Sequence, residues 1–170
     1  MIYQIVVGQF SKTLGNLLGI LEKAAAHAEV KGFDMEVLLQ ARLAPDQFNL
    51  IRQAQIACDT AKLGAARLAD KEKDAPSHPD NEQTLAEVKA RIQSVIDYLA
   101  TFSEADFSGA AKRRITQPRW DGKTLSGEEF LIQHAIPNLY FHATTLYAIL
   151  RHNGVDVGKK DYLGELPFKD

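Results

Sequence analysis

The chain has 170 residues, of which 45% are hydrophobic and 25% charged, the size and composition of one globular domain. The 20 Lys and Arg against 22 Asp and Glu give a net charge of −2, so the basic excess typical of proteins that bind nucleic acids or acidic membranes is missing. The single cysteine, Cys58, excludes an internal disulfide and a multi-cysteine zinc site. We therefore expect one cytoplasmic domain over residues 1–170, with no nucleic-acid or membrane partner.

The first two predicted helices run from about Tyr3 to Lys31 and from about Asp46 to Leu68. In the first, apolar residues recur every three or four positions, and Gly32 is a typical stop. Pro45 disfavours helix just before the second, so the segment between the two helices is expected to end irregularly. The inner stripe of the second helix consists of small residues that allow close packing: Ala54, Cys58, Ala61 and Ala65.

Two sequence patterns predict where the other long helices begin. Thr84 with Glu87, and Ser126 with Glu129, each match a capping box, in which two side chains satisfy the free N–H groups of a helix start. The third helix then extends to about Phe102 and the fourth to about His152. Between them, the helical period is lost from residue 103 to 125, and Asp121-Gly122 predicts a type I′ turn in a small β-hairpin. The tail after Gly154 shows no helical period and is expected to pack on the surface or meet a partner.

The fourth helix is predicted to lie inside the protein. Residues 130–150 contain no Asp, Glu, Lys or Arg, a length that would cross a bilayer. Several polar residues and Pro137 make a lone membrane span costly, so a buried central helix is the better interpretation. The predicted fold is thus all-α, a four-helix bundle with a hairpin in the long connection between the third and fourth helices.

A polar stripe on the fourth helix holds the concentrated chemistry of the chain. His134, Asn138 and His142 recur every four residues and so lie along one side of the helix. Buried imidazole and carboxamide groups need hydrogen-bond partners, because each unsatisfied group costs about 1–3 kcal/mol. Gln55 and Asp59 on the second helix are the expected partners, and the five residues together are the candidate ligand pocket.

Two segments, RLAPDQFNLIRQAQIACDTAK and GEEFLIQHAIPNLYFHATTLYAILRHNGV, resemble a domain-of-unknown-function family in the DinB-like (YfiT-type) four-helix-bundle superfamily. The resemblance covers nearly the whole chain. It implies a divalent metal, nickel or zinc, held by one histidine of the second helix and two of the last helix at i and i+4. Some members of the superfamily are thiol-dependent transferases.

The chain departs from that metal pattern at two of three positions. The resemblance places His142 on one ligand and Asn138 on another, and residues 46–68 contain no histidine. His134 and His142 are about 12 Å apart along an ideal helix, whereas Zn–N bonds are about 2.0–2.1 Å. We therefore expect no tightly bound catalytic metal. If a metal is present, its ligands are expected to be His142, His134 and Asn138.

Two functional hypotheses remain open. The first is a non-catalytic bundle that forms a homodimer or binds a small molecule, and the second is a metal- or thiol-dependent enzyme with its site at the fourth helix. Cys58 is either a nucleophile or a buried inert thiol, and Asp59 with Lys62 is either an acid–base pair or a surface ion pair. A basic-aromatic cluster near the hairpin is either an anion site or solvated surface: Lys112, Arg113, Arg114, Arg119 and Trp120.

Overall fold

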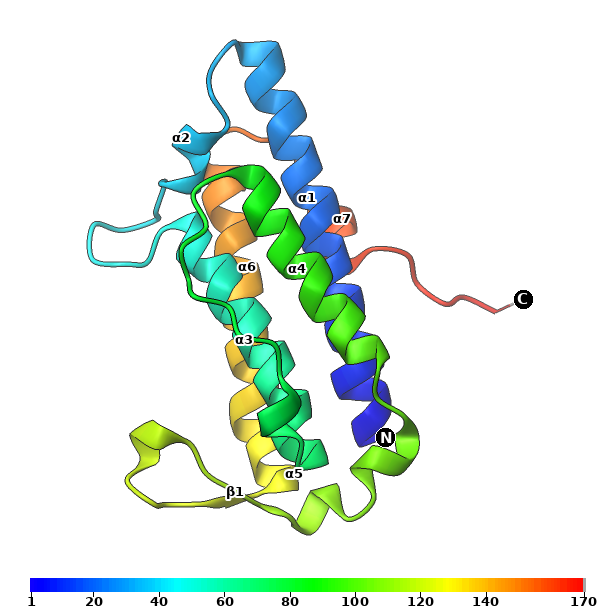
Figure 1. Ribbon diagram of the computed structural model, residues 1–170. Coiled ribbons are helices and arrows are strands. Elements are labelled where there is room, and N and C mark those ends of the chain that lie inside the picture. Colours follow the sequence, from blue (N-terminus) through cyan, green and yellow to red (C-terminus); the bar gives the residue numbers. More distant parts are fainter. Residues whose placement is uncertain (170) are drawn as a thin grey trace.

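The structure, a computed structural model that describes residues 1–169, is a bundle of four long helices (Figure 1). These are α1 (Phe10–Lys31), α3 (Leu50–Ala69), α4 (Leu85–Ala100) and α6 (Ile136–His152). Helix α3 packs against both α4 and α6, and α1 packs against both of them as well. The four apolar stripes meet in one core that includes Phe10, Leu14, Leu68, Leu99 and Leu139, all fully buried. The predicted all-α bundle is confirmed.

Local hydrogen bonds explain where α1 and α3 begin and end. A π-helical turn (Gln4–Gln9) leads into α1, which ends at Gly32 in the left-handed conformation with φ 74°. Helix α3 starts at Leu50, later than expected, because the side chain of Asn49 accepts a hydrogen bond from the Arg52 amide at 3.0 Å and caps the helix there. The preceding segment, expected to be irregular at its end, also contains the short helix α2 (Glu36–Leu39).

Both predicted capping boxes are present. Thr84 and Glu87 cap α4, and Ser126 and Glu129 cap the short helix α5 (Gly127–Phe130). The chain continues from α5 through a π-helical turn (Leu131–Ala135) directly into α6. This turn lies just before Pro137, which has no N–H to donate to the Gln133 carbonyl. Within residues 1–169, none of the helices is both long and apolar enough to cross a membrane.

The hairpin and its predicted Asp121-Gly122 turn are confirmed, but the turn does not join the two strands directly. The Lys123 amide donates to the Trp120 carbonyl at 2.9 Å and closes this turn. Strands β1 (Arg114–Ile115) and β2 (Leu125–Ser126) pair antiparallel, with Arg114 opposite Ser126. Asp121 and Gly122 both have positive φ, 49° and 78°, but they follow a 3₁₀ turn (Pro118–Trp120) inside a longer loop. This hairpin loop, residues 116–124, projects from the end of the bundle where α5 begins (Figure 1).

The remaining connections contain short helical segments. Three 3₁₀ turns lie in the linkers: Glu72–Asp74 between α3 and α4, and Glu104–Phe107 and Ala110–Lys112 before β1. The tail forms a short helix, α7 (Lys159–Leu163), where no helical period was expected. It packs beside α1 (Figure 1). Asn16 of α1 donates a hydrogen bond to the Tyr162 carbonyl at 2.9 Å.

Candidate functional site

A cavity of about 560 Å³ lies between α3 and α6 and is bordered by the hairpin loop. Its α3 wall follows the helical repeat, with side chains three or four positions apart: Arg52, Ile56, Asp59, Thr60, Leu63 and Arg67. The loop contributes Gln117, Pro118, Arg119 and Trp120, and Phe48 and Phe130 complete the two ends. We call this space the α3–α6 cavity.

The polar stripe predicted on the fourth helix lines this cavity. His134, Asn138 and His142 all lie on its wall. Nδ1 of His142 is 2.7 Å from Oε1 of Gln53, and Asn138 donates from Nδ2 to Thr60 Oγ1 at 2.6 Å. The helix α6 therefore presents its polar side chains to α3, as expected.

The hydrogen-bond partners of the stripe differ from those predicted. Gln55 turns instead towards the linker that precedes α4 and donates to Glu82 Oε2 at 2.8 Å. Asp59 lines the cavity, but its Oδ1 is engaged by Lys62 and Arg91, each at 2.9 Å. The reason is helical geometry: Gln53 and Thr60 are two turns apart on one face, whereas Gln55 is rotated by about 200° from Gln53.

His134 lies at the hairpin-loop end of the cavity. Its ring stacks on Phe130, with centroids 5.4 Å apart and an interplanar angle of 15°. Trp120 meets the same imidazole edge-on at 5.4 Å, and the Gln117 amide nitrogen is 3.3 Å from Nε2. The loop and the start of the fourth helix thus form an aromatic end wall of the cavity. The sequence analysis did not predict that these residues lie together.

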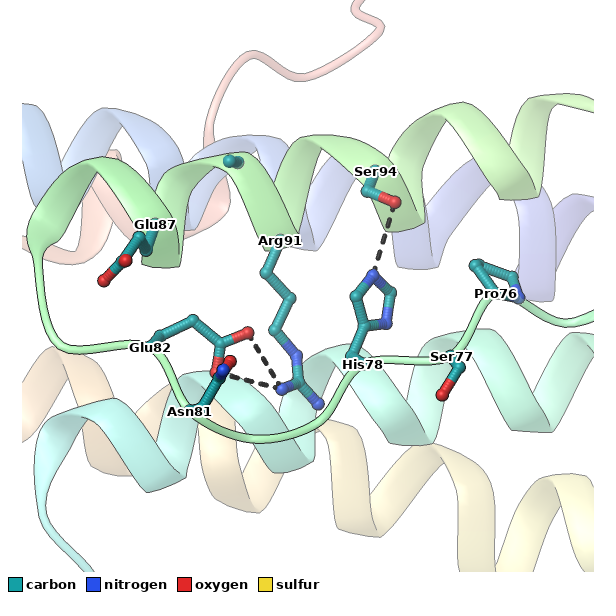
Figure 2. Close-up of a pocket in the computed structure, with 9 residues that line it drawn as sticks. Pro76, Ser77, His78, Asn81, Glu82, Glu87, Arg91 and Ser94 are labelled. Carbon is teal, nitrogen blue, oxygen red and sulfur yellow. Dashed lines mark hydrogen bonds and ion pairs between the residues drawn. The ribbon is translucent and has the colours of Figure 1, made fainter.

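Arg91 is the centre of a buried ion cluster beside the cavity. It points from α4 towards the linker, where it contacts Glu82 at 3.2 Å (Figure 2). It also contacts Asp80 of the linker at 2.5 Å. It also reaches Asp59 on α3. Arg52 contacts Asp80 from the cavity side at 2.5 Å. The carboxylates of Asp59, Asp80 and Glu82 are thereby matched by Arg52, Lys62 and Arg91, and Asp59 with Lys62 belongs to this cluster and is no isolated surface pair.

A second cavity, of about 440 Å³, adjoins the cluster and holds His78 and Ser94 (Figure 2). Nδ1 of His78 is 2.9 Å from Lys62 Nζ, and Nε2 is 3.3 Å from Ser94 Oγ. An ammonium group only donates, so Nδ1 accepts and the proton of the neutral ring is on Nε2. Because Nε2 then donates to Ser94, His78 cannot take the serine proton, and this pair is structural.

Burial keeps both cavity histidines uncharged. It lowers the pKa of His142 from 6.5 to about 4, with a further contribution from the positive charge of Arg52. It also lowers the pKa of His134, with Arg67 adding to the effect. At neutral pH these two side chains therefore offer imidazole nitrogens and no positive charge.

The charged residues of the wall are mostly cationic. Among the described residues, the wall contains three cationic side chains and one carboxylate. The cations are Arg52, Arg67 and Arg119, and the carboxylate is that of Asp59. Arg52 is paired with Asp80 and Arg67 with Glu72, at 2.5 and 2.8 Å. Arg119 is exposed and forms no ion pair within residues 1–169. Because Arg52, Arg67 and Asp59 are each paired with an opposite charge, Arg119 is the one unpaired charge on the described wall, and it favours a negatively charged group at the hairpin-loop end of the cavity.

The residues of the chain do not fit the metal that the superfamily resemblance implies. Across residues 1–169, no three His, Cys, Asp or Glu side chains come together in a way that could hold an ion. Of the His142 nitrogens, Nε2 alone is free, because Nδ1 faces Gln53, and Asn138 offers a neutral amide oxygen, since its nitrogen donates to Thr60. His134 is held in the aromatic end wall. The donor set is therefore unlike a three-histidine centre.

The structure bears on the alternatives for two other candidate sites, Cys58 and the basic-aromatic cluster. Cys58 is fully buried, and burial raises the pKa of its thiol to about 12, which favours the inert interpretation. Of the basic-aromatic cluster, Arg113 donates to the Leu68 carbonyl and Arg114 to Thr124. Of the five residues of this cluster, only Arg119 and Trp120 reach the cavity wall.

Sequence reasoning missed Gln53 and Thr60, although their spacing of seven residues on one helix face was a usable signal.

Comparison with known proteins places the chain in a family. A family model described as a domain of unknown function (DUF1993) matches residues 2–163. The chain belongs to the DUF1993 family. It is similar to the crystal structure of a DinB family member protein from Shewanella denitrificans, with 64% sequence identity and a TM-score of 0.97 over 100% of this chain and 96% of that one. No curated protein matches it. The DUF1993 chain therefore has the DinB-like fold expected from its sequence.

Proposed function

We propose that this DUF1993 protein binds a small organic anion with a flat ring in the α3–α6 cavity. The observation that carries the proposal is that Arg119 and Trp120, neighbours on the hairpin loop, both line the cavity. Trp120 also contacts His134, whose ring is stacked on Phe130. The cavity volume of about 560 Å³ falls in the range of roughly 300–1,000 Å³ typical of small-molecule sites.

The aromatic end wall supports a planar ligand group. Trp120, Phe130 and His134 form one cluster, in which Trp120 meets Phe130 edge-on at 6.2 Å and His134 edge-on at 5.4 Å. Trp120 and His134 are only partly buried and can meet a flat ring at little conformational cost, whereas Phe130 is fully buried and supports the His134 ring. Arg119, adjacent in sequence to Trp120, then supplies a guanidinium group for a carboxylate or phosphate.

The chemistry of the cavity supports binding without a tightly held catalytic metal. A metal would find one free imidazole nitrogen, Nε2 of His142, and beside it the neutral amide oxygen of Asn138, which is a weak ligand for zinc or nickel. A second candidate function, an enzyme of the DinB-like superfamily, is favoured by one observation, the uncharged imidazole of His142 on the cavity wall, which can accept a proton but is a weak base because its pKa is about 4. The binding function requires fewer assumptions, because no nucleophile accompanies that imidazole.

The binding proposal is tested with phenylacetate, mandelate and phenyl phosphate as probes. Titration followed by two-dimensional amide NMR should give saturable shifts confined to α3, α6 and the hairpin loop. Arg119→Ala should weaken binding at least threefold, whereas Arg114→Ala, on the same hairpin but paired with Thr124, should not. Absence of saturable binding for all three probes, or shifts elsewhere on the protein, would overturn the proposal.

We also propose that the protein is a cytoplasmic homodimer. Two large apolar side chains of the fourth helix, Ile132 and Phe141, are 57% and 56% exposed, and a second copy would cover such residues. The single buried thiol of Cys58 suits a reducing compartment. Light scattering at micromolar concentration should give a dimer that Phe141→Ser weakens, and a monomeric wild-type protein contradicts the proposal. Cell fractionation tests the location.

A further inference from the structure

The carboxamide of Gln53 has a defined orientation. Its Nε2 donates to the Phe48 carbonyl at 3.0 Å, and its Oε1 faces Nδ1 of His142 at 2.7 Å. The reversed orientation would put two oxygens, Oε1 and the Phe48 carbonyl, at hydrogen-bond distance with no proton between them. The main chain at Phe48 therefore determines which end of the amide meets His142.

This orientation determines the tautomer of His142. The carboxamide oxygen of Gln53 only accepts, so the proton of the neutral imidazole must be on Nδ1. Nε2 then carries an unshared electron pair. Burial keeps the ring uncharged, because the pKa of His142 is lowered to about 4. At neutral pH, His142 is thus a donor towards Gln53 and an acceptor at its opposite nitrogen.

The accepting nitrogen of His142 faces the cavity. The ring lines the cavity, and Nε2 has no hydrogen-bond partner within residues 1–169. Among the described residues, Arg91 Nε and Tyr98 Oη are the polar side-chain atoms that are both fully enclosed and unpaired. Nε2 of His142 is not one of them, so it is accessible from the cavity. One helical turn away, Asn138 gives its amide nitrogen to Thr60 and so leaves its oxygen as a second acceptor on this wall.

We infer that the α3–α6 cavity selects organic anions that also carry an O–H or N–H donor, which Nε2 of His142 accepts, with Gln53 as the residue that positions the imidazole. This inference rests on the proposed function and adds a specificity determinant to it. Arg119 binds the acidic group, the aromatic end wall binds the ring, and His142 discriminates hydroxy or amino acids from plain acids.

The tautomer is tested directly by long-range ¹H–¹⁵N NMR of the imidazole rings at pH 7. For His142 we expect a protonated, pyrrole-type Nδ1 and an unprotonated, pyridine-type Nε2. Gln53→Leu should remove this preference, a change that a purely structural role for Gln53 would not produce. A proton on Nε2, or a charged ring at pH 7, in the wild-type protein would overturn the inference even if the variant does not fold.

The selectivity is tested with mandelate and phenylacetate, which differ by one hydroxyl group. We expect wild-type protein to bind mandelate about threefold to tenfold more tightly, the net effect of one hydrogen bond. In His142→Asn, whose amide nitrogen replaces Nδ1 but which has no counterpart of Nε2, the preference should disappear. Equal wild-type affinities would overturn this inference and leave the proposed function intact. Binding of neither probe would overturn both.

Discussion

Asp59 and Arg91 join α3 to α4, with Oδ1 of Asp59 2.9 Å from Nη2 of Arg91. The Arg91 side chain is only 2% exposed and also contacts Asp80 and Glu82 of the linker. Because Asp59 is at the same time part of the cavity wall, this pair connects the packing of the bundle to the candidate site.

Removing the guanidinium group of Arg91 should destabilise the protein strongly. Arg91→Met keeps much of the volume but leaves three carboxylates without their shared cation, and we expect the free energy of unfolding to fall by about 3 kcal/mol. Urea denaturation measures this. Lys89→Met is the matched control on the same helix, because Lys89 pairs with Glu22 at an exposed position and should cost at most about 1 kcal/mol. Equal losses in both variants would contradict the role of the cluster.

Gly127 at the start of α5 cannot accept a side chain. A Cβ at this position would lie 1.9 Å from the Ala110 carbonyl oxygen and 3.0 Å from a Leu68 methyl carbon. Gly127→Ala should therefore lower the free energy of unfolding by about 1–3 kcal/mol, because the main chain must move. Gly19→Ala in α1 has open space around it and should raise stability by up to about 1 kcal/mol. A thermal melt of both variants that shows the same direction of change would refute this reasoning.

The stability of the protein should decrease as the pH falls from about 6.5 towards 4. The folded state holds the pKa of His142 at about 4 against 6.5 for an ordinary histidine, so the unfolded chain binds more protons in this interval. The stability contributed by the neutral ring is complete above pH 6.5 and lost by about pH 4, and amounts to at most about 3 kcal/mol.

His142→Asn isolates this contribution, since its side chain does not titrate. Urea denaturation at pH 7 and pH 4.5 should show a smaller loss of stability for the variant than for the wild-type protein. The pKa values of His134 and His78 are also lowered by burial, but both residues are present in the two proteins and cancel in the difference. An identical pH dependence would show that His142 is not held neutral by the fold.

Cys58 should not react with thiol reagents in the folded protein. Its side chain is completely buried, and burial raises the pKa of the thiol to about 12, so little thiolate exists at pH 8. We expect labelling by a disulfide reagent only at the rate at which the chain unfolds, and rapid labelling in urea. Stoichiometric labelling within seconds under native conditions would instead support the thiol nucleophile that the sequence left open.

Much of the fold follows from local patterns, which is why it was predictable. The capping boxes at Thr84 and Ser126 are made by residues three apart, so their hydrogen bonds form wherever the helix starts. The start of α3 was less accurate, because Asn49 caps a helix that the pattern alone placed earlier. The Asp121-Gly122 turn forms where the pattern predicts it, with both residues at positive φ, but it lies within a longer loop and does not join the strands directly.

The sequence by itself determined that His134, Asn138 and His142 share one inward side of a buried helix, because a helix repeats every 3.6 residues whatever surrounds it. Only the tertiary structure decided what they meet. The rotation of α3 about its axis presents Gln53 and Thr60 and turns Gln55 away, and the path of the hairpin loop brings Arg119 and Trp120 to the cavity. These contacts join residues far apart in the chain, so they depend on the packing of whole elements and leave no local pattern.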